Sequence, residues 1–222
     1  MFFRPSASVG GDRSQRRRKR RPVTVERFFT VRLLIAAQYG KENIMTLCTF
    51  GYRGVNIEKF LPLCEKNELN VVDVRSYPYS RFFPDYDREK LEQSLNKIGL
   101  QYRNYEPFGA RRNNKLLYTN GQFDFAKAAK DDEFVHCVNR LINAMNLGYR
   151  FILLCSEPMP EECHRAVLVA RAFYDKGIAV NHLIAIQNGF TIVSHRKWET
   201  KMREKYGNNF YTILNQKIGY KR

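Results

Sequence analysis

The sequence contains no apolar run that approaches the roughly 18 residues needed to cross a membrane. Its five cysteines are an odd number at irregular spacing, which argues against the disulfide framework of a secreted protein. We therefore expect a cytoplasmic protein in a reducing compartment, with no membrane partner. Cys48, Cys64 and Cys137 stand among apolar residues and are expected to be buried packing groups.

The stretch from Cys155 to Arg165 also lacks the spacing of three well-known sites. No glycine stands between Cys155 and Cys163, so a glycine-rich phosphate loop is excluded. A phosphatase-like cysteine loop holds its arginine closer to the cysteine than the ten residues that separate Arg165 from Cys155. Cys155, Cys163 and His164, with His182 as a fourth ligand, could converge on a metal, but C-x7-C-H is not a familiar zinc spacing. We therefore disfavour zinc, predict no metal site and name no cofactor.

Acidic residues are few beside the basic ones. The chain has 38 Lys and Arg against 22 Asp and Glu, a formal net charge of +16. Residues 1–44 hold 11 basic and 3 acidic residues, so half of this excess falls on that segment. The rest is still basic, which favours nucleic acid or a phosphate-bearing small molecule as the partner. Nothing in the composition indicates an oligomeric state.

The chain divides into three parts by composition. Residues 1–44 form a basic extension with the run RSQRRRKRRP, which we expect to be disordered or to precede a true translation start at Met45. A nucleic-acid-binding arm is the alternative. Residues 46–190 carry the patterns of an α/β domain, and residues 191–222 are predicted to form a charged C-terminal helix and tail.

Apolar runs alternate with helical patterns along the α/β part. Short buried strands are predicted at residues 46–50, 69–74, 100–105, 149–155 and 178–184. Helices are predicted at residues 56–67, 87–99 with Asp87 as cap, 124–148 with a break and cap at Asp131, and 161–177. Such alternation implies parallel strands joined by right-handed crossovers. We therefore predict an α/β fold, a three-layer Rossmann-like sandwich with a mainly parallel sheet of about five strands.

Charged and reactive residues follow the carboxyl ends of these strands. In open parallel sheets ligands bind at that edge, so we expect these residues to share one site. They are Tyr52 and Arg53 after the first strand, Asp73, Arg75, Ser80 and Arg81 after the second, Arg111 and Arg112 after the third, and Cys155, Glu157, Cys163, His164 and Arg165 after the fourth.

We assign chemistry to five of these residues and binding to the others. The predicted catalytic residues are Asp73, Glu157, His164, Cys155 and Cys163. The predicted phosphate- or substrate-binding residues are Arg53, Arg75, Ser80, Arg81, Arg111, Arg112, Arg165 and Tyr52. Arginines and aromatic side chains mixed on one edge are typical of a phosphate or nucleic-acid surface.

Most of these assignments have a structural alternative. Asp73 could form a structural ion pair instead of acting as a general base. Cys155 could pack in the core, and Cys163, in the first helical turn, has either a lowered thiol pKa or a place in the apolar stripe of the helix. Glu157, at the mouth of an apolar strand, can have a raised pKa and serve as acid or base. Neighbours on a helix diverge by about 100°, so we expect His164 to point away from Cys163.

Five motifs occur together in this chain: TFGYRG, VVDVRSYPYSRF, YEPFGARR, YTNGQFDF and LLCSEPMPEECHRA. In this order they resemble the family catalogued as domain of unknown function 488, over about residues 46–185. The resemblance implies a compact α/β domain. Its hallmark positions correspond here to Gly51-Tyr52, Asp73-Val74-Arg75, Ser80-Arg81, Cys155-x-Glu157 and Cys163-His164-Arg165.

Two functions fit these residues. The first is an enzyme that hydrolyses a glycosidic or phosphoester bond of a nucleotide or nucleic-acid substrate, with Glu157 or Asp73 as general acid/base and His164 as helper. The second is a non-catalytic module that binds nucleic acid or an anionic ligand through the same arginines, with structural cysteines. A thiol or metal redox role is a weaker third hypothesis.

Overall fold

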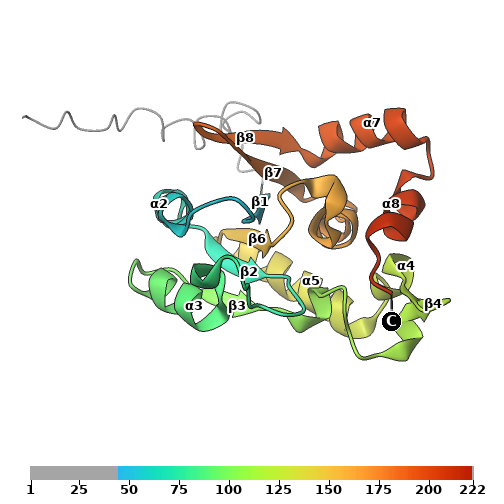
Figure 1. Cartoon of the computed structure of the whole chain (residues 1–222), viewed down its shortest axis with the longest axis horizontal. Coiled ribbons are helices and arrows are strands. Elements are labelled where there is room, and N and C mark those ends of the chain that lie inside the picture. The colour runs from blue at the N-terminus through green and yellow to red at the C-terminus, as the bar shows by residue number, and fades with distance from the viewer. Residues whose placement is uncertain (1–44, 222) are drawn as a thin grey trace, which may run out of the picture.

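The computed structural model describes residues 45–221, so the predictions for residues 1–44 lie outside the described residues. A six-stranded sheet with the order β3-β2-β6-β1-β7-β8 runs through the centre of the molecule (Figure 1). All neighbouring strands are parallel except β7 and β8. The prediction of an α/β sandwich with a mainly parallel sheet is confirmed.

Five of the six strands are those that the sequence predicts. They are β1 (Thr46–Gly51), β2 (Asn70–Asp73), β3 (Tyr102–Asn104), β6 (Phe151–Cys155) and β7 (Ala179–Ile186). The sixth, β8 (Gly189–Ser194), turns back from β7 and forms an antiparallel edge. Its side chains are mostly half-buried, so it lacks the apolar run of the central strands. The segment after β3 contains a separate two-stranded sheet of β4 (Tyr118–Thr119) and β5 (Gln122–Phe123).

Helices cover both faces of the sheet and complete the three layers (Figure 1). Ile152 and Leu154 of β6 face a core shared with α2 (Ile57–Asn67) and α3 (Arg88–Asn96). Leu153, between them, faces the opposite core. That face is covered by α4 (Phe125–Ala128), α5 (Asp132–Asn146), α6 (Arg171–Tyr174), α7 (His195–Tyr206) and α8 (Phe210–Ile218). No helix of the described part is long and apolar enough to cross a membrane.

Short polar side chains begin several helices as expected. Asn56 accepts a hydrogen bond from the amide of Glu58 at the start of α2. Asp131 caps α5, which confirms the break predicted there. Asp87 precedes α3 but makes no side-chain cap. Its carboxylate accepts a 2.7 Å hydrogen bond from the amide of Ser80 instead, and so ties the loop after β2 to the start of the helix.

The segment after β6 is less regular than the single helix predicted at residues 161–177. A short 3-10 turn at Pro160–Glu162 is followed by extended backbone at Cys163. The π-helix η6 (Arg165–Ala170) comes next and continues into α6. The apolar residues of η6 are buried as expected. π-Helical turns are rare and occur frequently at functional sites.

Candidate functional site

Three loops meet at the carboxyl end of β6. The amide of Arg53, just after β1, donates a 3.0 Å hydrogen bond to the carbonyl of Ser156. The amide of Val74, just after β2, donates a 3.0 Å hydrogen bond to the carbonyl of Leu154. The strand-end residues of β2, β6 and β1 therefore lie side by side, as the edge rule for parallel sheets predicts.

Glu157 forms the centre of a cluster of thiol and carboxylate groups. Its Oε2 atom lies 3.2 Å from the Sγ of Cys155 and 3.3 Å from the Sγ of Cys163. Its Oε1 atom accepts a 2.7 Å hydrogen bond from the hydroxyl of Ser156. Both cysteines are buried and unpaired, whereas the Glu157 side chain is 18% exposed. Glu157 is therefore the partly exposed neighbour of two buried cysteine side chains.

Cys163 lies before the helix and not in its first turn. Its backbone is extended, with φ −137° and ψ 134°. Its sulfur accepts a 3.5 Å hydrogen bond from the amide of Arg165, as an N-cap side chain does. Because the chain changes from extended to helical at this point, the expected divergence of His164 from Cys163 is wrong. The Nδ1 of His164 lies 4.0 Å from the Sγ of Cys155, and all three ligand atoms of these residues lie within 4.8 Å of one another.

His164 is held from its other side by the loop after β2. Its Nε2 donates a 2.8 Å hydrogen bond to the carbonyl of Val74. A carbonyl can only accept, so Nε2 carries a proton and Nδ1 is the nitrogen that faces the thiols. Burial lowers the pKa of His164, but the contact with Cys163 outweighs burial and raises it above the usual value.

Arg165 is completely buried and holds the loop after β6. Its guanidinium donates hydrogen bonds to the carbonyls of Glu157 and Pro158, the latter at 2.9 Å. The same loop passes directly over Gly51, where a Cβ atom would lie 1.7 Å from the carbonyl oxygen of Glu157. The structure thus places this arginine, predicted to bind substrate, on protein carbonyls, and it explains the glycine at the end of β1.

The surroundings shift the pKa values of the cluster in different directions. Burial raises the pKa of Glu157, but the Ser156 hydroxyl and nearby positive charge outweigh it and lower the pKa to about 2. The raised pKa anticipated for this carboxyl is therefore wrong. Burial also raises the pKa of Cys163, yet the hydrogen bond from Cys155 and the charge of Arg165 lower it to about 5. Burial raises the pKa of the Cys155 thiol well above its usual value.

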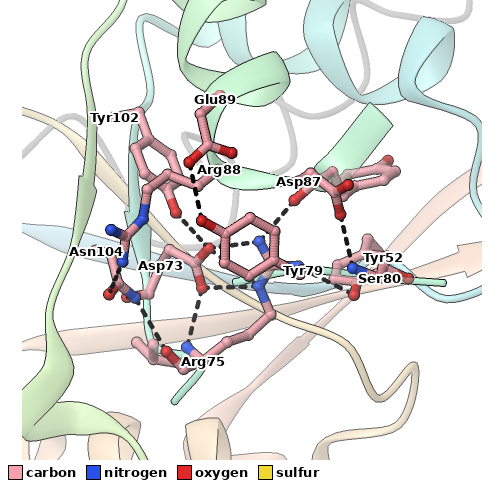
Figure 2. A network of polar contacts seen from close by, with 12 residues as sticks. Tyr52, Asp73, Arg75, Tyr79, Ser80, Asp87, Arg88, Glu89, Tyr102 and Asn104 are labelled. Atoms are coloured by element: carbon pink, nitrogen blue, oxygen red, sulfur yellow. Dashed lines mark hydrogen bonds and ion pairs between the residues drawn. The ribbon is translucent and has the colours of Figure 1, made fainter. Parts of the chain in front are cut away.

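Asp73 and Arg75 form a buried ion pair beside the cluster (Figure 2). Arg75 Nε lies 2.9 and 3.0 Å from the two carboxylate oxygens, and Nη2 lies 2.6 Å from Oδ2. Asp73 also accepts a 2.7 Å hydrogen bond from Tyr102, while Arg75 donates to Tyr52 and to the carbonyl of Tyr86. The two side chains are 0% and 5% exposed. Asp73 therefore forms a buried structural ion pair, which was the alternative to its role as a general base.

Ser80 and Tyr52 also make their contacts within the protein. The hydroxyl of Ser80 accepts a 3.1 Å hydrogen bond from the amide of Phe83. The ring of Tyr52 stacks on that of Tyr86 with the centroids 4.3 Å apart. Both residues therefore shape the loops that surround the cluster.

The predicted arginine surface divides into buried and exposed members. Arg112 is buried and pairs with Asp131 at 2.7 Å and with Glu133. Arg75 is buried on Asp73. The exposed members are Arg53, Arg81 and Arg111. Only these three are placed to meet a ligand from solvent.

Two of the exposed arginines lie near the solvent side of the cluster. Arg53 Nη2 is 3.8 Å from Oε1 of Glu157. Arg111 lies over the ring of Tyr220 at 3.9 Å. Burial and the negative charges of Glu157 and the thiols raise the pKa of Tyr220 to about 12, so Tyr220 lies within electrostatic reach of the cluster. Tyr220 and Ser156 are not among the residues predicted from the sequence. The place of Ser156 beside Glu157 is a signal that could identify it, whereas nothing in the sequence connects Tyr220 to the site.

The cluster lies in a segment that matches a known protein family. The family model described as "Domain of unknown function DUF488" matches residues 56–172. This match covers more than half of the chain and includes every residue of the cluster. The chain belongs to the DUF488 family. The predicted membership is confirmed over this range, which is narrower than the resemblance suggests. No curated protein and no solved structure matched the chain.

His182 of this DUF488 chain lies outside the cluster. Its Nδ1 is 2.8 Å from the hydroxyl of Thr49, and its Nε2 is 3.0 Å from the Nδ1 of His195. His195 continues to the hydroxyl of Tyr211, which donates to Glu199. Both ring nitrogens of His182 are therefore used in a buried chain of hydrogen bonds, and the possibility that it joins the cysteines as a fourth ligand is not supported.

A cavity of about 560 Å³ lies away from the cluster, between the β4–β5 hairpin, α4, η6 and α8. Its walls include Leu168, Arg171 and Tyr211. None of the cluster residues lines it. In this DUF488 protein the cluster of reactive groups and this cavity are separate features, and the cluster lies within the segment that the family model matches.

Proposed function

We propose that this DUF488 protein is an enzyme that hydrolyses a phosphoester bond of a nucleotide or nucleic-acid substrate at the solvent side of the cluster. The observation that carries the proposal is the position of Glu157. Its carboxylate lies against the sulfur atoms of both buried cysteines, is 18% exposed and lies 3.8 Å from the guanidinium of Arg53. With a pKa of about 2 this carboxylate is ionised at neutral pH, so it can accept a proton from water next to a phosphate bound by the arginine.

The proposed reaction uses three side chains at this surface. Arg53 and Arg111 bind the phosphate oxygens by charge-assisted hydrogen bonds. A water molecule attacks the phosphorus atom, Glu157 accepts its proton, and the new P–O bond replaces the ester P–O bond. The leaving alkoxide takes a proton from solvent. The buried His164 and cysteines position Glu157 and do not touch the substrate.

Phosphoester hydrolysis fits this surface better than glycosidic hydrolysis. Most glycosidases need two carboxyl groups that flank the scissile bond. Asp73, the second carboxylate predicted for acid–base chemistry, is fully buried on Arg75. A single water-activating carboxylate beside exposed arginines is sufficient for attack on a phosphate ester.

The test replaces Glu157 by glutamine and measures turnover of bis-p-nitrophenyl phosphate and of a labelled RNA oligonucleotide. We expect kcat to fall about 100-fold or more, because the amide cannot accept the proton. Glu161→Gln, on the same loop, is the matched control and should keep the wild-type rate. Thermal unfolding of both variants checks the fold. A folded Glu157→Gln variant with the wild-type rate contradicts the proposal.

Binding without turnover is the second candidate function. It is favoured by the burial of Cys155, Cys163 and His164, which are 2%, 1% and 5% exposed. The test is fluorescence anisotropy with the same RNA at increasing salt. Binding that weakens with salt, without product, supports a binding module and overturns the hydrolase. Absent or salt-independent binding contradicts the module.

A further inference from the structure

The arrangement of Cys155, Cys163 and His164 has the geometry of metal ligands. Their Sγ, Sγ and Nδ1 atoms all lie within 4.8 Å of one another. In a tetrahedral zinc site with Zn–S near 2.3 Å and Zn–N near 2.0 Å, ligand atoms lie roughly 3.3–3.8 Å apart. The three ligand atoms therefore need to approach one another by at most about 1–1.5 Å to meet one ion. The C-x7-C-H pattern is not a familiar zinc spacing, which is why the sequence alone disfavours zinc.

A carboxylate oxygen lies beside two of these three ligand atoms. The Oε2 atom of Glu157 lies 3.2 Å and 3.3 Å from the two sulfur atoms, close to the separation of neighbouring ligands in a tetrahedral site. We propose that Cys155, Cys163, His164 and Glu157 bind one zinc-type divalent ion. Thiolate and imidazole ligands select zinc over magnesium or calcium. Because only Glu157 reaches solvent, it is the ligand that water can replace, and once replaced its carboxylate is free to act as the base of the proposed reaction.

The imidazole of His164 is already oriented for coordination. Its Nε2–H donates a 2.8 Å hydrogen bond to the carbonyl of Val74, so the lone pair of the neutral ring is on Nδ1, toward the thiols. Metal-bound histidines almost always donate their other ring nitrogen to a carboxylate, carbonyl or water in this way. This contact comes from a different loop than the cysteines and supports the site independently of their spacing.

The charge around the cluster also fits a metal thiolate. Two thiolates, one carboxylate and a divalent ion carry a net charge of −1. Arg165 is completely buried, and among the described residues no carboxylate forms an ion pair with it. A buried cation without an opposite charge is strongly unfavourable, so negative charge on the metal site would stabilise the guanidinium. Its backbone amide also donates to the Cys163 sulfur, as amides do to metal-bound thiolates.

This proposal goes beyond the proposed reaction and is tested without any substrate. The full chain is purified untagged, without chelators, from medium that contains zinc, and its metals are counted by mass spectrometry. We expect about one zinc per chain. After exchange for Co²⁺, the thiolate charge-transfer and d–d absorption bands of tetrahedral cobalt should appear. A folded wild-type protein with neither zinc nor the cobalt spectrum overturns the proposal, whatever its activity.

Variants separate ligands from other cysteines and histidines. Cys155→Ser and His164→Asn should weaken zinc binding by 100-fold or more, whereas Glu157→Gln, which keeps three ligands, should weaken it about 10-fold. The matched controls Cys137→Ser and His136→Asn lie on α5, outside the cluster, and should bind as the wild type does. If a ligand variant does not fold, zinc protection of two of the five wild-type thiols against a disulfide reagent gives the same answer. Ligand variants that bind like the controls, or zinc that protects no thiol, overturn the site.

Discussion

The Nε2 of His164 lies 2.8 Å from the carbonyl oxygen of Val74. Val74 stands between Asp73 and Arg75, the buried ion pair, so this hydrogen bond joins the motif after β2 to the motif after β6. The ion pair therefore supports the histidine through the backbone between its two members. Two segments that are distant in the chain, one after β2 and one after β6, are therefore held together.

Replacing Gly51 by alanine should disrupt the cluster without touching its side chains. The new Cβ would lie 1.7 Å from the carbonyl oxygen of Glu157, which is backbone and cannot rotate away. We expect a loss of about 1–3 kcal/mol or more in the free energy of unfolding, measured with urea. Gly54→Ala has no atom within 4 Å of its Cβ position but lies at φ +83°, so it measures the cost of an alanine in left-handed backbone alone, about 1–2 kcal/mol. A loss in Gly51→Ala no larger than that in Gly54→Ala would contradict the close approach.

Breaking the Asp73–Arg75 pair should be among the most destabilising single changes. Asp73→Asn leaves the Arg75 guanidinium buried without its charge partner, and such changes cost about 3–5 kcal/mol. Urea unfolding measures the loss. Arg53→Gln removes the arginine of an exposed pair and should cost less than about 1 kcal/mol. A small effect of Asp73→Asn on stability, together with lost activity, would restore the catalytic role predicted from the sequence.

Stability should fall in mild acid because of His182 and His195. Burial lowers the pKa of His182 well below its usual value, and burial with the charge of Arg171 lowers that of His195 to about 3. The unfolded chain binds protons at these positions below about pH 6.5, whereas the folded chain does not. The free energy of unfolding should therefore fall between about pH 6.5 and pH 3, by up to about 1.4 kcal/mol per pH unit for each histidine.

Urea titrations across this range test the sign and the origin of the pH effect. His195→Gln should show a shallower fall than the wild type, because one of the two neutral imidazoles is gone. His136→Gln, an exposed histidine on α5, should keep the wild-type slope. A steeper fall in His195→Gln than in the wild type would contradict the assignment.

The exposed arginines should control the affinity for an anionic ligand. Arg53→Gln and Arg111→Gln should each weaken binding of a labelled RNA. Each should also reduce the slope of log Kd against log salt concentration by about 1, the value for one lost phosphate contact. Fluorescence anisotropy at several salt concentrations measures both quantities. Arg112→Gln is not a suitable control, because Arg112 is buried on Asp131. Arg81→Gln, exposed on the loop after β2, shows whether the surface extends beyond the cluster.

Most of the fold could be predicted because its signals are local in the chain. β6 is buried along its whole length and reads as an unbroken apolar run, and Asp131 begins α5 as a cap should. β8 was missed because it is a half-buried edge strand. The π-helix η6 was missed because its residues are as apolar as those of an α-helix, and only backbone geometry separates the two.

The candidate site was predicted in outline. The strand-end rule grouped Cys155, Glu157, Cys163 and His164 correctly on one edge, but it also included Arg75 and Arg165, whose guanidiniums serve the fold. Spacing could not separate them, because an arginine beside a carboxylate reads the same in sequence whether it is buried or exposed.

The sequence by itself determined the layers of this protein, its family resemblance and the sheet edge where its charged and reactive residues gather, because hydrophobic periodicity and motifs are properties of neighbouring residues. Only the tertiary structure decided which groups meet. The parallel register of β1, β6 and β2 brings Gly51 and Val74 to the loop after β6, and the extended backbone at Cys163 turns its sulfur toward Cys155 and Glu157. Distances between side chains on separate loops depend on that register. The register pairs strands that are distant in the chain, so it cannot be predicted from a local sequence pattern.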